Sequence, residues 1–203
     1  MPEETKDDIV EAESSEEAIT KIHQQITEII NWTLGCKSIT FLGFEQQLIP
    51  KIFILGRLFV LLFLTMREEQ YREKHPHAEA GYKNQGPKPR IFACFFGRLR
   101  YFRTYLFKLT GNGGYYPLDI ELGFTQDGFS MLVQSYAVRL ASKVSYAQAV
   151  GLLTLFLGWS PGQRTLEETV LGFGKHTVDW FEFQPAPEDD GEVLIIQLDS
   201  KAT

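Results

Sequence analysis

Apolar residues recur at helical spacing in the first part of the chain. Between residues 19 and 33 they stand mostly three or four positions apart, which predicts an amphipathic helix. Ser14 and Glu17 have the spacing of a capping box, in which the serine accepts from a first-turn amide and the glutamate reaches back to the cap. Gly35 is placed to end this helix, because glycine tolerates the left-handed conformation that commonly closes one.

A second helical stretch covers residues 39–74 and contains Pro50, which predicts a bend because proline lacks a backbone donor. Its most apolar run, residues 52–66, includes Arg57 and falls short of the ~20 residues that span a bilayer. The run is therefore interpreted as a buried or dimer-facing helix. Together, residues 15–75 predict a helical region, either a two-helix scaffold or a coiled pairing.

Prolines, glycines and few apolar residues mark residues 76–89 as a linker between two parts of the chain. The pattern then changes to two aromatic runs on either side of Gly97 and Arg98. These runs predict a β-hairpin within residues 90–118, with its turn at those two residues.

The pattern returns to helical spacing over residues 119–183. One helix is expected over residues 130–142, and Ser145 caps a second that ends at Gly158. Because Pro161 follows a serine, a third helix is expected to begin there. A helix, a short turn with glycine and a capped helix form the outline of a helix-turn-helix, although packed helical pairs that do not bind DNA share it.

A short apolar run over residues 193–198 is typical of a strand buried on both faces. Such a strand needs neighbours, so it either pairs with the hairpin or begins a larger sheet. Residues 184–203 are therefore interpreted as a linker followed by the first strand of an incomplete core. The chain is predicted to be an α+β protein with N-terminal helices, a basic hairpin, a helix-turn-helix-like segment and this terminal strand.

The charge of the chain is unevenly distributed, and this changes the interpretation of the hairpin. The net charge is −6, but residues 1–20 alone hold −7, and residues 1–14 are predicted to be an acidic disordered tail. Residues 82–118 contain seven basic residues and no acid. A local positive field of this kind favours phosphate binding, with an affinity that falls as salt rises. The alternative is an ordinary hairpin whose outward positions are basic.

The two cysteines, Cys36 and Cys94, lie far apart in the sequence, without the spacing of a disulfide framework or a zinc site. This fits a reducing cytosol. The chain does not begin with a basic stretch followed by an apolar segment, so a secretory signal is not expected. We therefore expect a cytoplasmic protein.

Basic and polar side chains on the hairpin and on the third helix are the candidates for contacts with DNA. The first turn of that helix suits base edges or phosphates if it enters a major groove, although Glu167 and Glu168 would face phosphates at a cost. The alternative there is a packed helical pair. The candidates are Lys88, Arg90, Arg98, Arg100, Arg103, Lys108, Gln163, Arg164 and Thr165.

Asp199 follows the predicted terminal strand, at a place where a sheet-based active site presents metal ligands. One carboxylate cannot hold two magnesium ions, so partner acids must come from elsewhere. From the spacing alone, an ordinary loop aspartate is the alternative.

Four segments in order resemble the N-terminal half of the Kra-type insertion-sequence transposases: RIFACFFGRLRYFRTYLFK, YYPLDIELGF, VSYAQAVGLLTLFLGWSPGQRTLEETVLGFG and VLIIQLDSKAT. The resemblance covers residues 39–203 and rests on the order of the segments more than on any single motif. It implies a DDE-type enzyme, whose RNase-H-like core holds three acids on metal ions to cut and rejoin DNA. Asp199 then takes the place of the first catalytic carboxylate and metal ligand, in a stretch that reads Asp-Ser-Lys-Ala where the family has an Asp-Gly-Lys-Gly-like sequence.

The resemblance implies transposon-end DNA as the partner, and a truncated transposase that is inactive alone, because the sequence stops at Thr203 before the other two acids. A homodimer through the N-terminal helices and a C-terminal transposase part acting in trans are further expected partners, and no small-molecule substrate is expected. Mg²⁺ belongs to the complete enzyme and is not expected to bind stably to this chain alone. The alternative function is a helical interaction or membrane-surface protein that uses the apolar helix of residues 52–66.

Overall fold

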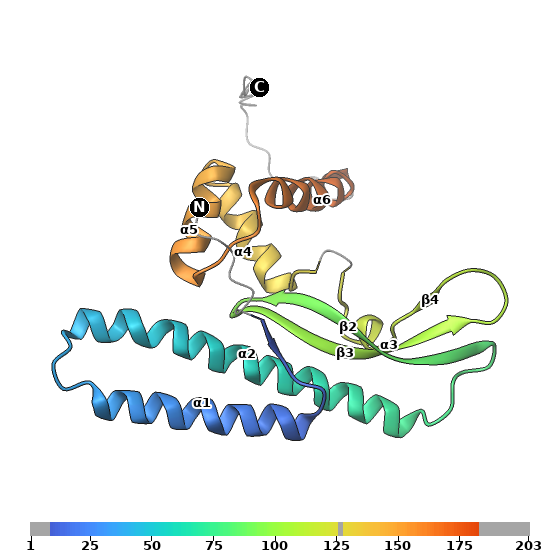
Figure 1. Ribbon diagram of the computed structural model, residues 1–203. Helices are drawn as coiled ribbons and strands as arrows, with labels where there is room; N and C mark the ends of the chain where they lie inside the picture. The colour runs from blue at the N-terminus through green and yellow to red at the C-terminus, as the bar shows by residue number, and fades with distance from the viewer. Residues whose placement is uncertain (1–8, 126–127, 183–203) are drawn as a thin grey trace, which may run out of the picture.

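The computed structural model of the chain describes residues 9–125 and 128–182 (Figure 1). Within these residues the chain forms six helices and a mixed four-stranded sheet, so the predicted α+β class is confirmed. The predicted strand of residues 193–198, and the RNase-H-like core that it would begin, lie outside the described residues.

Helix α1 covers Ser15–Gly35, as its apolar spacing and its expected end at Gly35 predict. The Oγ of Ser14 accepts a hydrogen bond from the Glu17 amide at 3.1 Å, so the predicted N-cap forms. The carboxylate of Glu17 accepts from the Glu13 amide, at 2.9 Å, and not from the amide of the cap residue itself. The start of α1 therefore has both hydrogen bonds of a capping box, except that Glu17 accepts from the amide of Glu13 where the predicted box uses the amide of Ser14.

Helix α2 covers Phe41–Lys74 and continues through Pro50. It runs antiparallel to α1, since Trp32 near the end of α1 stacks on Phe44 near the start of α2, with ring centroids 5.1 Å apart. At the other end of the pair, the Ser15 amide donates to Glu69 at 2.8 Å. The two helices therefore form a long antiparallel pair, as the scaffold interpretation expects.

The predicted hairpin forms, but its first strand is longer than predicted. Strands β2, Tyr82–Cys94, and β3, Gly97–Lys108, pair antiparallel, and Phe95 and Phe96 make the turn. The predicted linker of residues 76–89 is therefore wrong from Tyr82 onward, and the predicted turn at positions 97 and 98 is off by two residues. Prolines are tolerated in β2 because it is an edge strand, in the sheet order β1-β3-β2, where a missing backbone donor breaks no ladder on the outer side.

Two short strands complete the sheet on the other edge of β3. Strand β1, Val10–Glu11, pairs in parallel with β3, and β4, Gly114–Tyr115, pairs antiparallel with it. The predicted disordered tail of residues 1–14 is thus wrong at its end, because β1 is paired and Ala12 is 1% exposed. Helix α3, Pro117–Glu121, follows β4 and crosses the boundary that the pattern places after residue 118.

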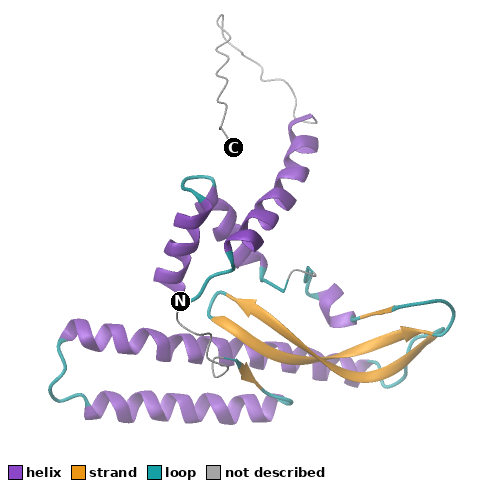
Figure 2. Ribbon diagram, turned by 45° about the horizontal axis from the view of Figure 1, so that its top comes forward, coloured by secondary structure: helices purple, strands orange, loops and turns teal. Residues whose placement is uncertain are grey.

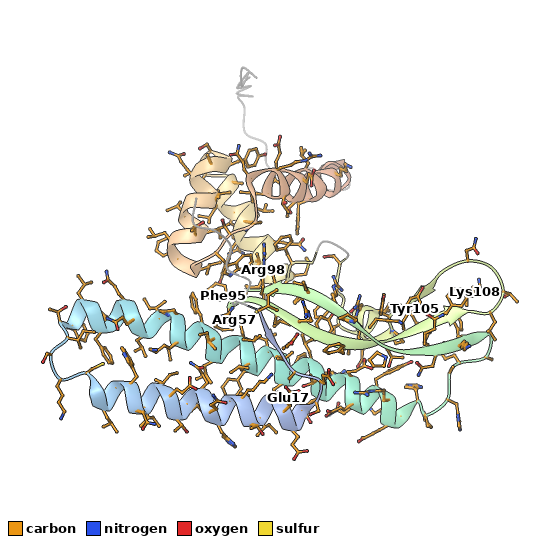
Figure 3. The ribbon with its side chains drawn as sticks, in the orientation of Figure 1. Glu17, Arg57, Phe95, Arg98, Tyr105 and Lys108 are labelled. Carbon is orange, nitrogen blue, oxygen red and sulfur yellow. The ribbon has the colours of Figure 1, made fainter. Side chains whose placement is uncertain are left out.

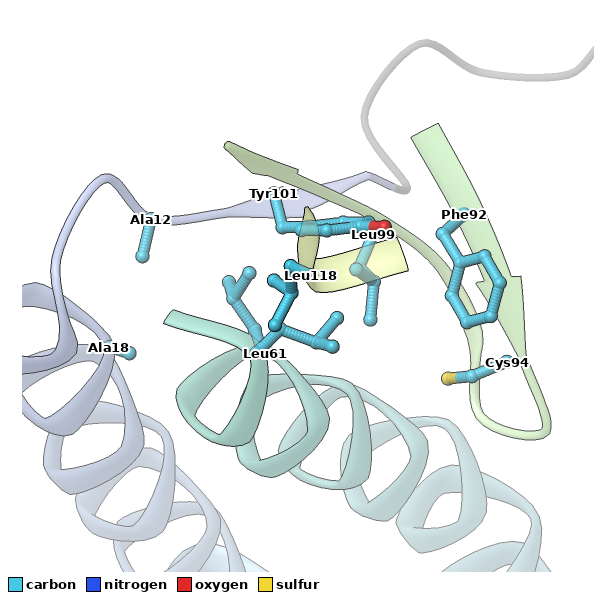
Figure 4. Close-up of a cluster of buried hydrophobic side chains, with 9 residues drawn as sticks. Ala12, Ala18, Leu61, Phe92, Cys94, Leu99, Tyr101 and Leu118 are labelled. Carbon is cyan, nitrogen blue, oxygen red and sulfur yellow. The ribbon is translucent and has the colours of Figure 1, made fainter. Parts of the chain in front are cut away.

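The main core lies between α2 and the sheet (Figure 4). Leu61 and Leu64 of α2 pack against Leu99 and Tyr101 of β3, and Leu118 of α3 closes the cluster; all five are at most 1% exposed. Full burial of such a side chain stabilises the fold by roughly 1.5–3 kcal/mol. The packing fixes the hairpin on one side of the helix pair.

The hairpin turn comes to rest on α2 at a glycine. A Cβ on Gly56 would lie 2.5 Å from the ring of Phe96, so only glycine lets the turn approach this closely. Phe53 of α2 and Phe95 of the turn meet edge to face, with centroids 6.4 Å apart, and Phe95 also contacts Tyr136 at 5.8 Å. These aromatic contacts join the helix pair, the hairpin turn and the helices that follow.

Three further helices pack together: α4, Met131–Ala141, α5, Tyr146–Leu157, and α6, Gln163–Glu182. They have a core of their own, formed by five residues that are at most 5% exposed: Ala137, Ala149, Leu153, Leu157 and Leu166. We call these helices the α4–α6 unit. Figure 2 shows that it lies on the opposite side of the hairpin from the α1–α2 pair.

Candidate nucleic-acid interface

The register of the hairpin divides the predicted DNA-binding cations between its two faces. Residues directly opposite each other on paired strands point to the same face. Lys88 lies opposite Arg103 and Arg90 lies opposite Tyr101, which places the three cations on the face that carries the core. Arg100 lies opposite Ile91, on the other face. The hairpin therefore does not present its cations as one row.

On the core face, two of the predicted cations converge on one carboxylate. Asp119 of α3 accepts from Arg90 Nη1 at 2.8 Å and from Arg103 Nε at 2.9 Å, and Tyr101 donates its hydroxyl to the same group at 2.9 Å. The arginine side chains are only 11% and 9% exposed. The guanidinium of Arg103 also stacks over Tyr116, 3.6 Å from its ring centroid. This arrangement ties α3 to the hairpin and leaves little of either arginine accessible to a phosphate.

Burial, followed by the negative charge of Asp119, raises the pKa of the Tyr101 hydroxyl well above its usual value. The hydroxyl therefore stays protonated and donates to the carboxylate. Three donors around one half-buried acid pair polar groups that the fold would otherwise leave without partners.

The outer face has a second acid that lies far away in the sequence. Arg100 donates to Glu11 of β1 at 3.0 Å, between side chains that are 40% and 49% exposed. The parallel pairing of β1 with β3 positions this contact, because Glu11 lies in register with Arg100. The acidic N-terminal segment thus supplies a counter-charge to the base-rich hairpin.

A third acid reaches the hairpin from α2. Glu68 is 1% exposed and accepts from both the amide and the hydroxyl of Thr104, at 2.9 and 2.6 Å, while Arg72 lies 3.5 Å away. Thr104 lies between the residues of β3 that pair with β1 and those that pair with β4. Burial raises the pKa of Glu68, against the lowering effect of the two bonds from Thr104. This carboxyl joins the sheet to the helix pair.

Three predicted cations on the hairpin remain exposed. Arg98 lies near the turn and Lys108 at the opposite end of β3 (Figure 3), and Lys88 is exposed on β2 between them. They span the length of the hairpin. If they contact a nucleic acid, they contact separate phosphates.

The first turn of α6 exposes two of its three predicted contact residues. Gln163 and Arg164 are exposed and Thr165 is half-buried, while Leu166 turns inward into the core of the unit at 0% exposure. Arg164 donates to Glu168, one turn further along, at 2.9 Å between side chains that are 91% and 60% exposed. An exposed pair of this type is weak and opens easily.

The predicted start and end of α5 are confirmed, whereas the predicted start of α6 is not. Ser145 and Gln148 form a capping box at the start of α5, and Gly158 ends it with φ 73°, a left-handed conformation that favours glycine. Helix α6 begins at Gln163, two residues later than the proline at position 161 predicts. The turn between the two helices is therefore longer than expected.

The predicted catalytic residue and metal ligand, Asp199, lies outside the described residues. Within residues 9–125 and 128–182 no three histidine, cysteine or acidic side chains are grouped to hold a metal ion.

Asp119 is the residue of this region that the sequence pattern does not single out. It directly follows the acid-free stretch of residues 82–118, and it becomes part of the site because the fold brings two arginines into contact with it.

Comparison of the chain with known protein families, curated proteins and solved structures gives no match.

Proposed function

We propose that this chain is the DNA-binding N-terminal part of a transposase of the kind that its segments resemble, with double-stranded transposon-end DNA as its partner. The observation that carries the proposal is the α4–α6 unit. It has its own core, an α5 that is capped at its start and ends at Gly158, and an α6 whose first turn exposes Gln163 and Arg164. The exposed first turn supports the proposal, because a recognition helix contacts base edges with its N-terminal residues.

The charge of the middle of the chain supports the same proposal. Residues 82–118 contain seven lysines and arginines and no acid, so the positive charge lies on the hairpin, whereas residues 119–182 contain four bases and seven acids. Arg90, Arg100 and Arg103 are balanced by acids from other elements. The proposed phosphate contacts are the cations that the structure exposes, namely Lys88, Arg98, Lys108 and Arg164.

Salt dependence of binding tests this proposal directly. Binding of the full chain to labelled double-stranded DNA of mixed sequence is measured by fluorescence anisotropy over a range of salt concentrations. Replacing Lys88, Arg98 and Lys108 together by alanine is expected to reduce the slope of log K against log salt by about 3, since each phosphate contact contributes about 0.9. A matched control is Lys37→Ala, at an exposed lysine in the connection between α1 and α2. Binding that is insensitive to salt, or a slope that the control changes equally, would contradict the proposal.

The strand-transfer part of the proposal rests on the resemblance and on Asp199. We propose that Asp199 acts with the carboxylates of a C-terminal transposase part supplied in trans. The test is Mg²⁺-dependent nicking of DNA by the assembled pair, which is expected to disappear in Asp199→Ala. Correct assembly without nicking contradicts this part and leaves the DNA-binding part standing.

A further inference from the structure

The α1–α2 pair exposes a group of large apolar side chains, which we call the helix-pair face. Its members are Ile19, Ile26 and Ile30 of α1 and Phe41, Ile52, Phe59, Phe63 and Met66 of α2. Each of these side chains is between 37% and 76% exposed. Large apolar side chains exposed singly are common, but eight of them on one pair of helices are not.

These residues share one side of the helix pair. A rotation of 100° per residue places Ile19, Ile26 and Ile30 about a quarter-turn around α1 from Ala18 and Ile22, which are buried toward α2. In α2, Phe44 and Glu69 contact α1.

The exposed residues of α2 lie about a quarter-turn from these two contacts, in the same sense of rotation. Because the helices are right-handed and antiparallel, flanks reached by the same rotation lie on the same side of the pair. The sheet covers the other side, through Leu61, Leu64 and Glu68.

The area of the helix-pair face matches what a stable protein interface requires. The exposed fractions of the eight residues add up to the surface of about four fully exposed side chains. At roughly 200 Å² for each side chain, the face leaves on the order of 800 Å² of apolar surface in water. That is about the area that each partner buries in an interface of standard size, and it exceeds the largest apolar patch of a typical monomer.

The composition of the face favours a second copy of the chain as its occupant. Between residues 41 and 66, the helical positions of α2 on this side include one charged residue, Glu45. Interfaces between identical subunits are more apolar than other interfaces, and one apolar face can pair with itself about a two-fold axis.

A membrane is the other apolar surface that the face could meet. Among the described helices, α2 is long and apolar enough to cross a bilayer by length and composition, and 28% of its most apolar window is buried in the fold. Membrane-surface helices carry basic residues beside their apolar stripe, which attract anionic lipids. Here the first turn of α1 carries Glu16 and Glu17, and residues 1–20 have a net charge of −7, which anionic lipids repel.

We propose that two copies of this chain associate through the helix-pair face and form a four-helix bundle, in which α1 and α2 of each copy are antiparallel. Each copy contributes α1 and α2, and the sheets lie on the two outer sides of the bundle. This association does not depend on the proposed DNA binding, and the two are tested by separate measurements.

Analytical ultracentrifugation of the full chain over a range of concentrations tests the proposal. The wild-type chain is expected to sediment as a dimer at micromolar concentration. The double variant Phe59→Glu with Phe63→Glu is expected to weaken the dimer by at least about 1,000-fold, because the symmetry places four unpaired carboxylates in one apolar interface. The matched control is Leu155→Glu with Phe156→Glu, at side chains of α5 that are 73% and 66% exposed but lie outside the face. The control is expected to stay dimeric.

A wild-type chain that is monomeric at about 50 μM, above the Kd range of stable interfaces, would overturn the proposal. A charged variant that dimerises as well as the wild type would overturn it too. The third contrary outcome is that the wild type floats with phosphatidylserine-containing vesicles and the charged variant does not, which would assign the face to a membrane. Circular dichroism checks that each variant is folded. If the charged variant is not folded, Phe59→Ala with Phe63→Ala replaces it. That pair is expected to weaken the dimer by about 100-fold through lost apolar contact, and an unchanged dimer contradicts the proposal equally.

Discussion

The β2–β3 hairpin and the α4–α6 unit differ in their charge and in how it is balanced, since residues 82–108 contain seven bases and no acid whereas residues 131–182 contain four of each. Three hairpin arginines are balanced by Asp119 and Glu11, which lie outside the two strands. In the α4–α6 unit, Arg164 is balanced by Glu168 on its own helix. A helix brings residues four apart into contact, whereas a strand depends on whatever the fold places beside it. A charge counted along the sequence therefore describes the field of a helix better than that of a hairpin.

The two kinds of balance also differ in energy. The side chains around Asp119 are at most 14% exposed, so losing one partner leaves the others buried and charged. The pair in α6 is largely exposed, so losing it has little effect on stability. Ion pairs thus add to the apolar core in attaching α3 to the hairpin, whereas the exposed pair of α6 adds little to the apolar core of the α4–α6 unit.

The largest expected effect is the removal of Asp119, the acid that the two largely buried arginines share. Asp119→Ala leaves Arg90, Arg103 and the Tyr101 hydroxyl without their shared acceptor, and we expect the free energy of unfolding to fall by about 3–5 kcal/mol. Urea denaturation measures the change. The control is Glu121→Ala, which removes the exposed partner of Arg67 and is expected to cost less than about 1 kcal/mol. Equal effects of the two substitutions would show that burial does not distinguish them.

Alanine substitutions at two glycines of the α5 segment test how this helix contributes to the stability of the α4–α6 unit. Gly158 ends α5 at φ 73°, so Gly158→Ala is expected to destabilise the chain by about 1–2 kcal/mol through backbone strain. Gly151 lies within α5, and a Cβ there meets no atom within 4 Å, so Gly151→Ala is expected to stabilise by about 0.5–1 kcal/mol. Thermal denaturation compares them. A change of the same sign for both alanines would mean that α5 does not end at Gly158.

The buried carboxyl of Glu68 gives the attachment of the hairpin to α2 a pH dependence. Burial raises its pKa in the folded chain above 4.5, its ordinary value, so the folded state binds the proton more tightly than the unfolded state does. The stability from this group is complete below the ordinary value and is lost as pH rises through the raised pKa. We expect the wild-type chain to lose stability relative to Glu68→Gln over that window, as measured by urea denaturation at several pH values. A gain in relative stability with rising pH would reverse the sign and refute the argument.

How far the sequence predicts this fold depends on how local each signal is. Ser14, Ser145 and Gly158 act on neighbouring residues, and the structure has the helix starts and end that they predict. The prolines of residues 76–89 wrongly predict a linker over residues 82–89, because an edge strand accepts proline and only the complete sheet shows that β2 is an edge strand. The contacts of Asp119 could not be predicted either, because no spacing rule links it to the arginines that it binds.

The smallest expected effect sharpens the comparison on the exposed face of the hairpin. Glu11→Gln removes the counter-charge of Arg100, and because this pair is exposed, the free energy of unfolding is expected to change by less than about 0.5 kcal/mol. The freed cation is expected to strengthen DNA binding at low salt by a factor of about 2–5, measured by fluorescence anisotropy, and this gain should shrink as salt screens the charge. Glu13→Gln is the control, since Glu13 lies beside the same strand but outside the register of β1 with β3. Equal gains from both variants would mean that DNA binding responds to the total negative charge of this segment, and not to the specific contact between Glu11 and Arg100.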